Sequence, residues 1–271
     1  MTTLVIGSTG KTGRRIVRRL NDLGTPVRGA SRRSTPRFDW QQPSAWPAAL
    51  QGVTSVYVSY HPDLAAPGAP DTIRAFTTAA TRAGVRQLVL LSGRGESNAQ
   101  RCEQIVRESR LSHTLIRASW FFQNFTEGDL LEPVLAGTVA LPAGMVGEPF
   151  VDVNDIADVA VAALTGDQHD GRLYELTGPR LLTFAEATAE MSEATGRDIR
   201  YAPISLEQFH AALTESVGPD HADLLTGLCR EVFDGRNQSL GRGVQEALGR
   251  EPRDFADFCR TATRTGVWTT A

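Results

Sequence analysis

The stretch VIGSTGKTGRR, residues 5–15, belongs to the first apolar run of the chain and the turn after it, and its glycines decide the fold. Its GKT triplet matches the end of a triphosphate-binding loop, G-x-x-x-x-G-K-[ST], but that loop needs a glycine where this chain has Val5. The glycines instead recur every third residue from the end of the run, at Gly7, Gly10 and Gly13. This spacing is typical of a dinucleotide-binding turn between a first strand and a helix, so we expect a dinucleotide rather than a triphosphate.

Short apolar runs alternate with helical patterns along the first half of the chain. The strand-like runs are residues 3–6, 26–30, 54–59, 87–92 and 113–118. Amphipathic helical patterns lie between them, and two of these end at Gly24 and Gly84. The alternation predicts an α/β fold, a doubly wound parallel sheet of the Rossmann type with helices on both faces.

Helical patterns dominate after residue 120. They cover residues 155–165, 183–195, 205–216, 220–233 and 252–264, with one strand-like run at 173–178. We therefore predict a dinucleotide-binding core over residues 1–122, completed by strand and helix elements within 138–178. Residues 123–137 and 179–271 are predicted to form a smaller, mainly helical cap that binds the substrate.

Composition excludes several classes of partner. The net charge of -3 and the 41% of hydrophobic residues favour a soluble globular protein without the basic surface that nucleic acid or anionic lipid requires. Neither a targeting segment nor a long apolar run is evident, so we expect a cytoplasmic protein with no membrane partner. The three cysteines are far apart, without metal-ligand spacing, and are expected to be small core residues. A monomer and a homodimer are both compatible with these patterns.

The end of the second predicted strand indicates which dinucleotide is bound. NAD-binding folds usually place an acidic residue there to hold the ribose 2′-hydroxyl. Here Ser31, Arg32 and Arg33 occupy that end, and a guanidinium matches a phosphate group bidentately. Lys11, the only lysine of the chain, adds charge to the same region. We therefore expect NADPH rather than NADH, the alternative being a solvated basic turn without a ligand.

Several stretches resemble the NmrA-like atypical short-chain dehydrogenase/reductases, and in particular their agroclavine dehydrogenase-like branch from ergot alkaloid biosynthesis. They are GSTGKTG (7–13), DW (39–40), LVLLSG (88–93), TLIRASWFFQNF (114–125), FVDVNDIADVAVAAL (150–164) and YELTGP (174–179). The resemblance spans most of the chain. It implies adenine near Asp39 and Trp40, the nicotinamide ribose near residues 59–61, and nicotinamide near residues 92–94 and 119–121.

Together these arguments give a set of expected cofactor-binding residues at the turn and at the strand ends. The set is Gly7, Ser8, Thr9, Gly10, Lys11, Thr12, Gly13, Ser31, Arg32, Arg33, Asp39, Trp40, Ser59, Gly93 and Ser119.

The catalytic pair of most short-chain dehydrogenases is missing from this sequence. That pair is Tyr-x-x-x-Lys, in which the phenol protonates the nascent alkoxide. None of the four tyrosines is followed four residues later by a lysine, and Gly95 and Ala99 stand where the family pattern would place the pair. A hydride added to an iminium carbon gives a neutral amine directly, so an iminium acceptor needs no such acid. Agroclavine dehydrogenase is an iminium reductase, and the resemblance to it points the same way.

Other groups can polarise or contact a substrate. Tyr60 and His61 follow the strand at 54–59, and Ser92 ends the strand at 87–92; these three are the candidate catalytic residues, with turn or hydroxyl-capping roles as the alternative. Expected substrate contacts include a dense aromatic patch, part of which core packing also explains. They are Arg94, Trp120, Phe121, Phe122, Asn124, Phe125, Phe150 and Asp152. Asp152, Asp155 and Asp158 fit the start of a helix better than a metal site, and Asp152 is a possible counter-ion for a cationic substrate.

Three functions remain open from the sequence. The first is an NADPH-dependent reductase of a small hydrophobic imine, iminium, quinone or activated carbonyl in secondary metabolism. The second is a non-catalytic NADP(H) sensor of the NmrA type that regulates a transcription factor. The third is a ketoreductase in which Tyr60, His61 or Ser92 substitutes for the missing acid. The aromatic patch and the helical cap favour an enclosed substrate site and hence the first function.

Overall fold

A computed structural model describes residues 2–269, and the chain divides into two compact units. Unit 1 consists of the residues up to Ala118, Val153–Leu176 and Arg242–Arg250. Unit 2 consists of Ser119–Asp152, Thr177–Gly241 and the residues from Glu251 on. Within the described residues, no helix is both long and apolar enough to cross a membrane.

The centre of unit 1 is a six-stranded sheet in the order β2-β1-β3-β4-β5-β7, in which every neighbouring pair is parallel. Its strands are β1 (Thr2–Ile6), β2 (Val27–Ala30), β3 (Val53–Val58), β4 (Gln87–Gly93), β5 (Ser112–Ala118) and β7 (Arg172–Leu176). The order reverses at β1, because β2 lies on one side of it and β3 on the other. In a doubly wound sheet, the carboxyl ends of the strands at this switch point are where ligands bind.

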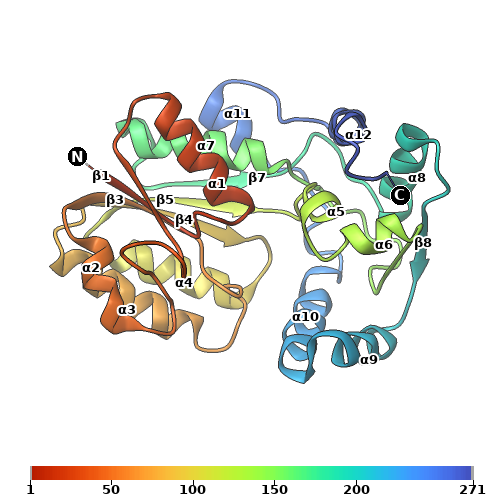
Figure 1. The fold of residues 1–271 in the computed structure, drawn as a ribbon, viewed down its shortest axis with the longest axis horizontal. Coiled ribbons are helices and arrows are strands. Elements are labelled where there is room, and N and C mark those ends of the chain that lie inside the picture. Colours follow the sequence, from red (N-terminus) through yellow and green to blue (C-terminus); the bar gives the residue numbers. More distant parts are fainter. Residues whose placement is uncertain (1, 270–271) are drawn as a thin grey trace. The chain divides into compact units, whose positions relative to one another are not determined.

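Helices cover both faces of this sheet (Figure 1). On one face lie α1 (Lys11–Asp22) and α7 (Val153–Thr165); on the other lie α2 (Trp46–Leu50), α3 (Ala69–Arg82) and α4 (Ser97–Glu108). Leu4, Val5 and Ile6 on β1 are at most 1% exposed, as expected for a parallel strand that is covered on both sides. The predicted α/β fold with a doubly wound parallel sheet is confirmed.

Unit 2 is mainly helical, and it also contains a small parallel sheet. Its helices are α5 (Asn124–Glu127), α6 (Leu131–Leu135), α8 (Phe184–Thr195), α9 (Leu206–Val217), α10 (Pro219–Val232) and α12 (Phe255–Arg264). β6 (Thr138–Leu141) pairs in parallel with β8 (Arg200–Pro203). The capping boxes at Thr183 and Ser205 fix where α8 and α9 begin. An aromatic core that includes Phe125 and Phe255 holds these elements together.

The observed division differs from the predicted domain boundaries, by a few residues at 119–122 and 177–178 and by longer segments at 138–152 and 242–250. Residues 138–152 were expected to complete the core, but β6 pairs with β8, and this segment belongs to unit 2. Residues 242–250 were expected in the cap, but α11 (Gly243–Leu248) belongs to unit 1, where it packs on α7 and β7. A Cβ at Gly243 would lie 2.6 Å from the carbonyl oxygen of Glu175, so the absence of a side chain permits this close packing. Local patterns carry no signal for either long-range contact.

Candidate cofactor and substrate site

The glycine turn after β1 has the geometry of a phosphate-binding loop. Gly7 has φ +75°, a conformation that side chains rarely adopt, and its N–H and that of Ser8 donate to the carbonyl oxygen of Ala30 at the end of β2. A Cβ at Gly13 would lie 2.2 Å from the carbonyl oxygen of Gly7, so α1 approaches the turn as closely as glycine allows. Gly10 is the N-cap residue of α1, and no side chain caps the helix there. A helix that begins in this way is suited to bind a pyrophosphate at its N-terminus.

The residues after β2 add positive charge beside this turn. Arg32 and Arg33 are exposed, and within residues 2–269 neither side chain forms an ion pair or a hydrogen bond. The nearest acidic residue along the chain, Asp39, is ion-paired to Arg37, with 2.9 Å between its Oδ2 and the guanidinium nitrogen. Arg32 and Arg33 therefore offer two exposed guanidinium groups to a phosphate.

Trp40 lies in a buried aromatic cluster rather than on an open surface. Its ring is within 5.1 Å of the rings of Tyr60, Phe38 and Phe76, and the residue is 8% exposed. Its indole N–H donates to the carbonyl oxygen of Ser59 over 3.2 Å. Trp40 thus fixes the backbone at the end of β3, and its expected contact with adenine stays a prediction.

The end of β3 brings several predicted residues to the edge of the sheet beside the glycine turn. A Cβ at Gly7 would lie 3.2 Å from the Cβ of Ser59, so these two backbones are in close approach. Tyr60 is partly exposed and His61 is exposed. Tyr57, three residues before Tyr60 and within β3, is fully buried, and burial raises the pKa of its phenol, so it is not a proton donor near neutral pH.

At the end of β4 a buried ion-pair network holds Ser92. The Ser92 hydroxyl donates to Oε1 of Glu103 over 2.7 Å, and Arg117 donates from Nε to Oε1 and from a terminal nitrogen to Oε2 of the same carboxylate. Glu103 is 2% exposed. Because Glu103 accepts the hydroxyl hydrogen of Ser92, this geometry does not support the predicted role of Ser92 as a substitute acid.

Arg94 belongs to the same end of the sheet. It is 8% exposed, and its Nε lies 3.6 Å from Oε2 of Glu175, which also pairs with Arg117. The ion pair with Glu103 is the main cause of a raised pKa at Arg117. The predicted substrate contact of Arg94 therefore involves a side chain that is mostly buried, and Gly93 between Ser92 and Arg94 is the more accessible position.

The aromatic patch of unit 2 separates into core and partly exposed members. Phe122, Phe125 and Phe150 are at most 1% exposed and pack around the ring of Phe255. These three rings lie in the core of unit 2, and their expected contact with substrate stays a prediction. Trp120 and Phe121 are partly exposed and remain predicted contacts.

The remaining predicted residues of unit 2 are polar. Asp152 is 4% exposed, and its Oδ1 accepts a hydrogen bond of 2.8 Å from Nε2 of Gln123. Ser119 is 5% exposed, and Asn124, the first residue of α5, is partly exposed. As a counter-ion for a cationic substrate, Asp152 would thus act from a buried position.

The other two aspartates of the 152–158 cluster pair with arginines. Asp155 lies in the first turn of α7 and is 2.7 Å from a guanidinium nitrogen of Arg250. Asp158 lies 2.7 Å from guanidinium nitrogens of both Arg19 and Arg250. α7 begins at Val153, directly after Asp152, so the cluster lies at a helix start as expected.

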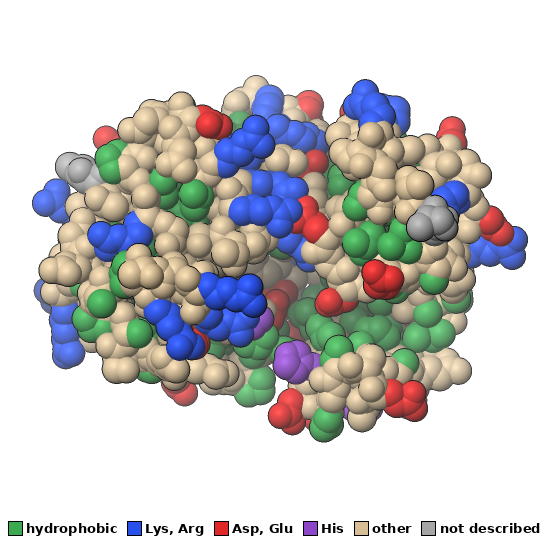
Figure 2. Space-filling model, in the orientation of Figure 1, with side chains coloured by type: hydrophobic (Ala, Val, Ile, Leu, Met, Phe, Trp, Pro, Cys, Tyr) green, Lys and Arg blue, Asp and Glu red, His purple; other side chains and the backbone are tan. Residues whose placement is uncertain are grey.

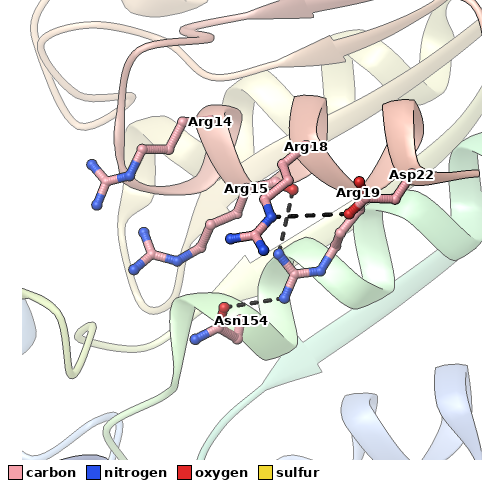
Figure 3. Close-up of a pocket in the computed structure, with 6 residues that line it drawn as sticks. All are labelled: Arg14, Arg15, Arg18, Arg19, Asp22 and Asn154. Carbon is pink, nitrogen blue, oxygen red and sulfur yellow. Dashed lines mark hydrogen bonds and ion pairs between the residues drawn. The ribbon is translucent and has the colours of Figure 1, made fainter. Parts of the chain in front are cut away.

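Sequence reasoning did not single out an arginine-lined hollow beside α1. It has a volume of about 590 Å³ and is lined by Arg14, Arg15, Arg18, Arg19, Asp22 and Asn154. In Figure 3 Arg14 and Arg15 extend outward from α1, whereas Arg19 reaches α7 and donates to Asn154. Blue side chains gather over α1 on the face that Figure 2 shows. The RRIVRR pattern at 14–19 was the available signal, since residues three and four apart share a helix face.

Sequence reasoning also missed two carboxyl groups, Asp63 after β3 and Glu96 before α4. Burial raises the pKa of Asp63, an interaction with the Glu96 side chain lowers it, and Glu96 is 8% exposed. The signal for this interaction would have been that both residues follow neighbouring parallel strands, whose carboxyl ends meet at one edge of the sheet.

No protein family model matches the chain, but known proteins resemble it along nearly its whole length. The chain is 33% identical to NAD(P)H azoreductase of Xenophilus azovorans over 95% of this chain and 96% of that protein. It is 30% identical to agroclavine dehydrogenase of Claviceps fusiformis over 99% of each. Among solved structures, NADPH-dependent quinone oxidoreductase of Escherichia coli, complexed with NADPH, superposes with a TM-score of 0.80 at 21% identity, over 96% of this chain and 99% of that one.

Proposed function

We propose that this chain, which belongs to the family of NAD(P)H-dependent reductases that includes NAD(P)H azoreductase and agroclavine dehydrogenase, transfers hydride from NADPH to a small hydrophobic acceptor. The acceptor carries a C=N bond or is similarly activated, as in a quinone or an activated carbonyl. NADPH, when bound, supplies the hydride.

The observation that carries this proposal is a pair of exposed guanidinium groups beside the glycine turn, for which residues 2–269 supply no ion-pair or hydrogen-bond partner. Arg32 and Arg33 follow β2, whose last residue, Ala30, accepts hydrogen bonds from the turn. The residues of the turn and the start of α1 would hold the pyrophosphate, and the two arginines would hold the 2′-phosphate. The bound dinucleotide is then NADPH rather than NADH.

The acceptor class follows from what the chain lacks. Lys11 is its only lysine and lies in the cofactor turn, so the family's tyrosine–lysine pair cannot form. Ser92 donates to Glu103, and Tyr57 is buried, which leaves Tyr60 and His61 as the candidate groups after β3. Reduction of an iminium or a quinone makes a smaller demand on a strong acid than ketone reduction does. One relative is by name an azoreductase and one structural neighbour a quinone oxidoreductase, which supports acceptors other than plain ketones.

The first test is NADPH consumption, followed by absorbance, with cyclic imines, N-alkyl iminium salts, quinones and aromatic ketones, and with NADH in parallel. Turnover of the activated acceptors with a preference for NADPH is the expected result. Tight NADPH binding without consumption by any acceptor would replace the reductase by a dinucleotide sensor. Ketone turnover that Tyr60→Phe abolishes, with cofactor binding intact, would replace it by a ketoreductase.

The cofactor assignment has its own test in Arg32→Ala. Loss of one charged hydrogen-bonded contact to a phosphate costs about 1.5–3 kcal/mol, which corresponds to about 10- to 100-fold in affinity for NADPH. NADH, which lacks the phosphate, should bind as before. Arg82→Ala, an exposed arginine at the end of α3, is the matched control and should change neither affinity. Equal weakening of NADPH and NADH by Arg32→Ala would refute the 2′-phosphate assignment.

A further inference from the structure

The two exposed arginines after β2 occupy the corner positions of a β-turn. Ser31 and Ser34 are the first and last residues of this turn, and the backbone N–H of Ser34 donates to the carbonyl oxygen of Ser31 over 3.3 Å. Arg32 and Arg33 lie between them, so the conformation of the turn decides from where both side chains project. The order of this turn therefore determines whether the two guanidinium groups act as one site or as two separate mobile charges.

The hydroxyl group of Ser34 closes the turn from within. Its oxygen accepts a hydrogen bond of 2.8 Å from the backbone N–H of Ser31. Its hydrogen has two carbonyl oxygens within reach, that of Ser31 at 2.9 Å and that of Pro36 at 2.8 Å. One short side chain thus joins the residue before the two arginines to the segment that leaves the turn.

Backbone groups attach the same turn to the core of unit 1. The N–H of Phe38 donates to the carbonyl oxygen of Ser31 over 2.9 Å, and the N–H of Arg33 donates to the Ser31 hydroxyl over 3.2 Å. Phe38 is 2% exposed, and its ring packs against those of Trp46 and Phe76. The base of the turn is therefore anchored in a buried aromatic cluster, and the Ser34 hydroxyl connects the corner of the turn to this base.

The end of β2 also connects this turn to the glycine turn. Ala30, the residue before Ser31, accepts hydrogen bonds of 3.0 and 3.2 Å at its carbonyl oxygen from the N–H groups of Gly7 and Ser8. A Cβ at Gly29 would lie 3.0 Å from both side-chain atoms of Ser8, so the two turns are in close approach. The pyrophosphate and the 2′-phosphate belong to one ligand, and a frame that fixes both turns in advance lowers the entropic cost of binding them together.

We propose that Ser34 is a specificity-determining residue, whose hydroxyl holds Arg32 and Arg33 in the arrangement that receives the 2′-phosphate and so sets the preference for NADPH over NADH. This assignment rests on the proposed function. Ser34 acts through the arginines and is a positioning residue. Without its hydroxyl, binding of the 2′-phosphate has to order the turn first. Fixing the backbone of one residue corresponds to about 5- to 30-fold in an equilibrium constant.

Ser34→Ala tests this assignment through the affinities for NADPH and NADH, measured by titration of the nicotinamide fluorescence. The variant should weaken NADPH binding by about 5- to 30-fold. NADH binding should stay unchanged, because NADH has no phosphate for the ordered turn to receive. Ser34→Thr keeps the hydroxyl and should keep most of the preference. Ser216→Ala is the matched control at an exposed serine of α9, whose hydroxyl donates to the carbonyl oxygen of Leu213, and it should change neither affinity.

A second measurement separates positioning of the arginines from a general effect on the fold. The Arg32→Ala/Arg33→Ala protein has no guanidinium group left for Ser34 to position. Adding Ser34→Ala to this protein should therefore not weaken NADPH binding further, since residues that act through one another are not additive. Equal losses in the wild-type background and in the arginine-free background would show that Ser34 acts independently of the arginines, and would overturn the assignment.

The outcomes distinguish this assignment from the proposed function. A wild type that binds NADPH and NADH with equal affinity overturns the proposed 2′-phosphate site itself. A wild type that prefers NADPH, together with a Ser34→Ala protein that keeps the preference or that weakens both dinucleotides equally, overturns only the role of Ser34. Loss of the preference in a Ser34→Thr protein that is as stable in urea as the wild type also overturns that role.

Discussion

Gly13→Ala adds one methyl group at the closest backbone contact of the cofactor turn. Its carbon would lie 2.2 Å from the carbonyl oxygen of Gly7 and 2.7 Å from the carbonyl carbon, where ordinary van der Waals contact begins at 3.4 Å. Backbone atoms therefore have to move by more than 1 Å, because no flexible side chain can give way. Over-packing of this kind costs about 3 kcal/mol at the upper end of its range. Alanine in a helix regains about 1 kcal/mol relative to glycine, which leaves a net loss of about 2 kcal/mol.

Gly227→Ala is the matched control, since Gly227 lies within α10 and nothing lies within 4 Å of the position of its Cβ. The same substitution should there stabilise the protein by about 1 kcal/mol, through helix propensity alone. The two variants thus differ in sign, and the difference between them measures the contact at Gly7.

Urea unfolding and NADPH fluorescence titration measure the two effects of Gly13→Ala. The free energy of unfolding should fall by about 2 kcal/mol, which corresponds to a decrease in Tm of about 4–8 °C for a protein of this size. NADPH affinity should fall by about tenfold or more, because displaced backbone donors lose charged hydrogen bonds to phosphate. A Gly13→Ala protein with wild-type stability and wild-type NADPH affinity would refute the close approach of α1 to the turn.

Three further predictions concern interactions away from the turn. Glu103→Gln should lower the free energy of unfolding by about 3 kcal/mol in urea titrations, because Arg117 loses the carboxylate of a largely buried ion pair. The double variant Glu103→Gln/Arg117→Met should recover part of this loss, and a double variant without any recovery would argue against the ion pair. Thr183→Ala removes the capping box of α8 and should cost about 1 kcal/mol, whereas an unchanged midpoint would show that the cap is dispensable. Hydrogen bonds from Arg180 are the main cause that lowers the pKa of Asp254 from 3.8 in the folded protein. The ionised Asp254 carboxylate therefore stabilises the folded state above pH 3.8, and this contribution is lost as the pH falls through the pKa of the folded state. Stability measured at about pH 6 and about pH 3 should therefore fall more in the wild type than in Arg180→Met, and equal falls would contradict the linkage.

The parts of the fold that sequence predicts are those with local signals. Gly7 and Gly13 are separated by one turn and the start of one helix, so their spacing reports a contact within a dozen residues. The capping boxes at Thr183 and Ser205 are local in the same way, and α8 and α9 begin where they indicate. The alternation of strands and helices then restricts the topology to a doubly wound sheet.

The parts that sequence does not predict depend on contacts between distant segments. β6 and β8 are short strands about 60 residues apart, and neither has a periodicity that identifies its partner. The burial of the aromatic residues could not be predicted either, because nothing in the run from Trp120 to Phe125 distinguishes rings that face the core from rings that stay partly exposed. Ser92 has the position expected for a catalytic hydroxyl, but its neighbour Glu103 comes from a helix whose rotation the sequence does not determine.

The arginine-lined hollow beside α1 has a kinetic consequence. The protein carries a net charge of -3, so at long range it repels an anionic dinucleotide weakly. Within about 8–10 Å, the screening length at moderate ionic strength, Arg14, Arg15 and Arg18 present a local positive potential on the helix that begins at the glycine turn. Such a potential steers an approaching anion and raises the rate of its capture, with little effect on how long it stays bound. At low cofactor concentration, ionic strength would then set the rate at which the dinucleotide arrives before any step of the reaction begins.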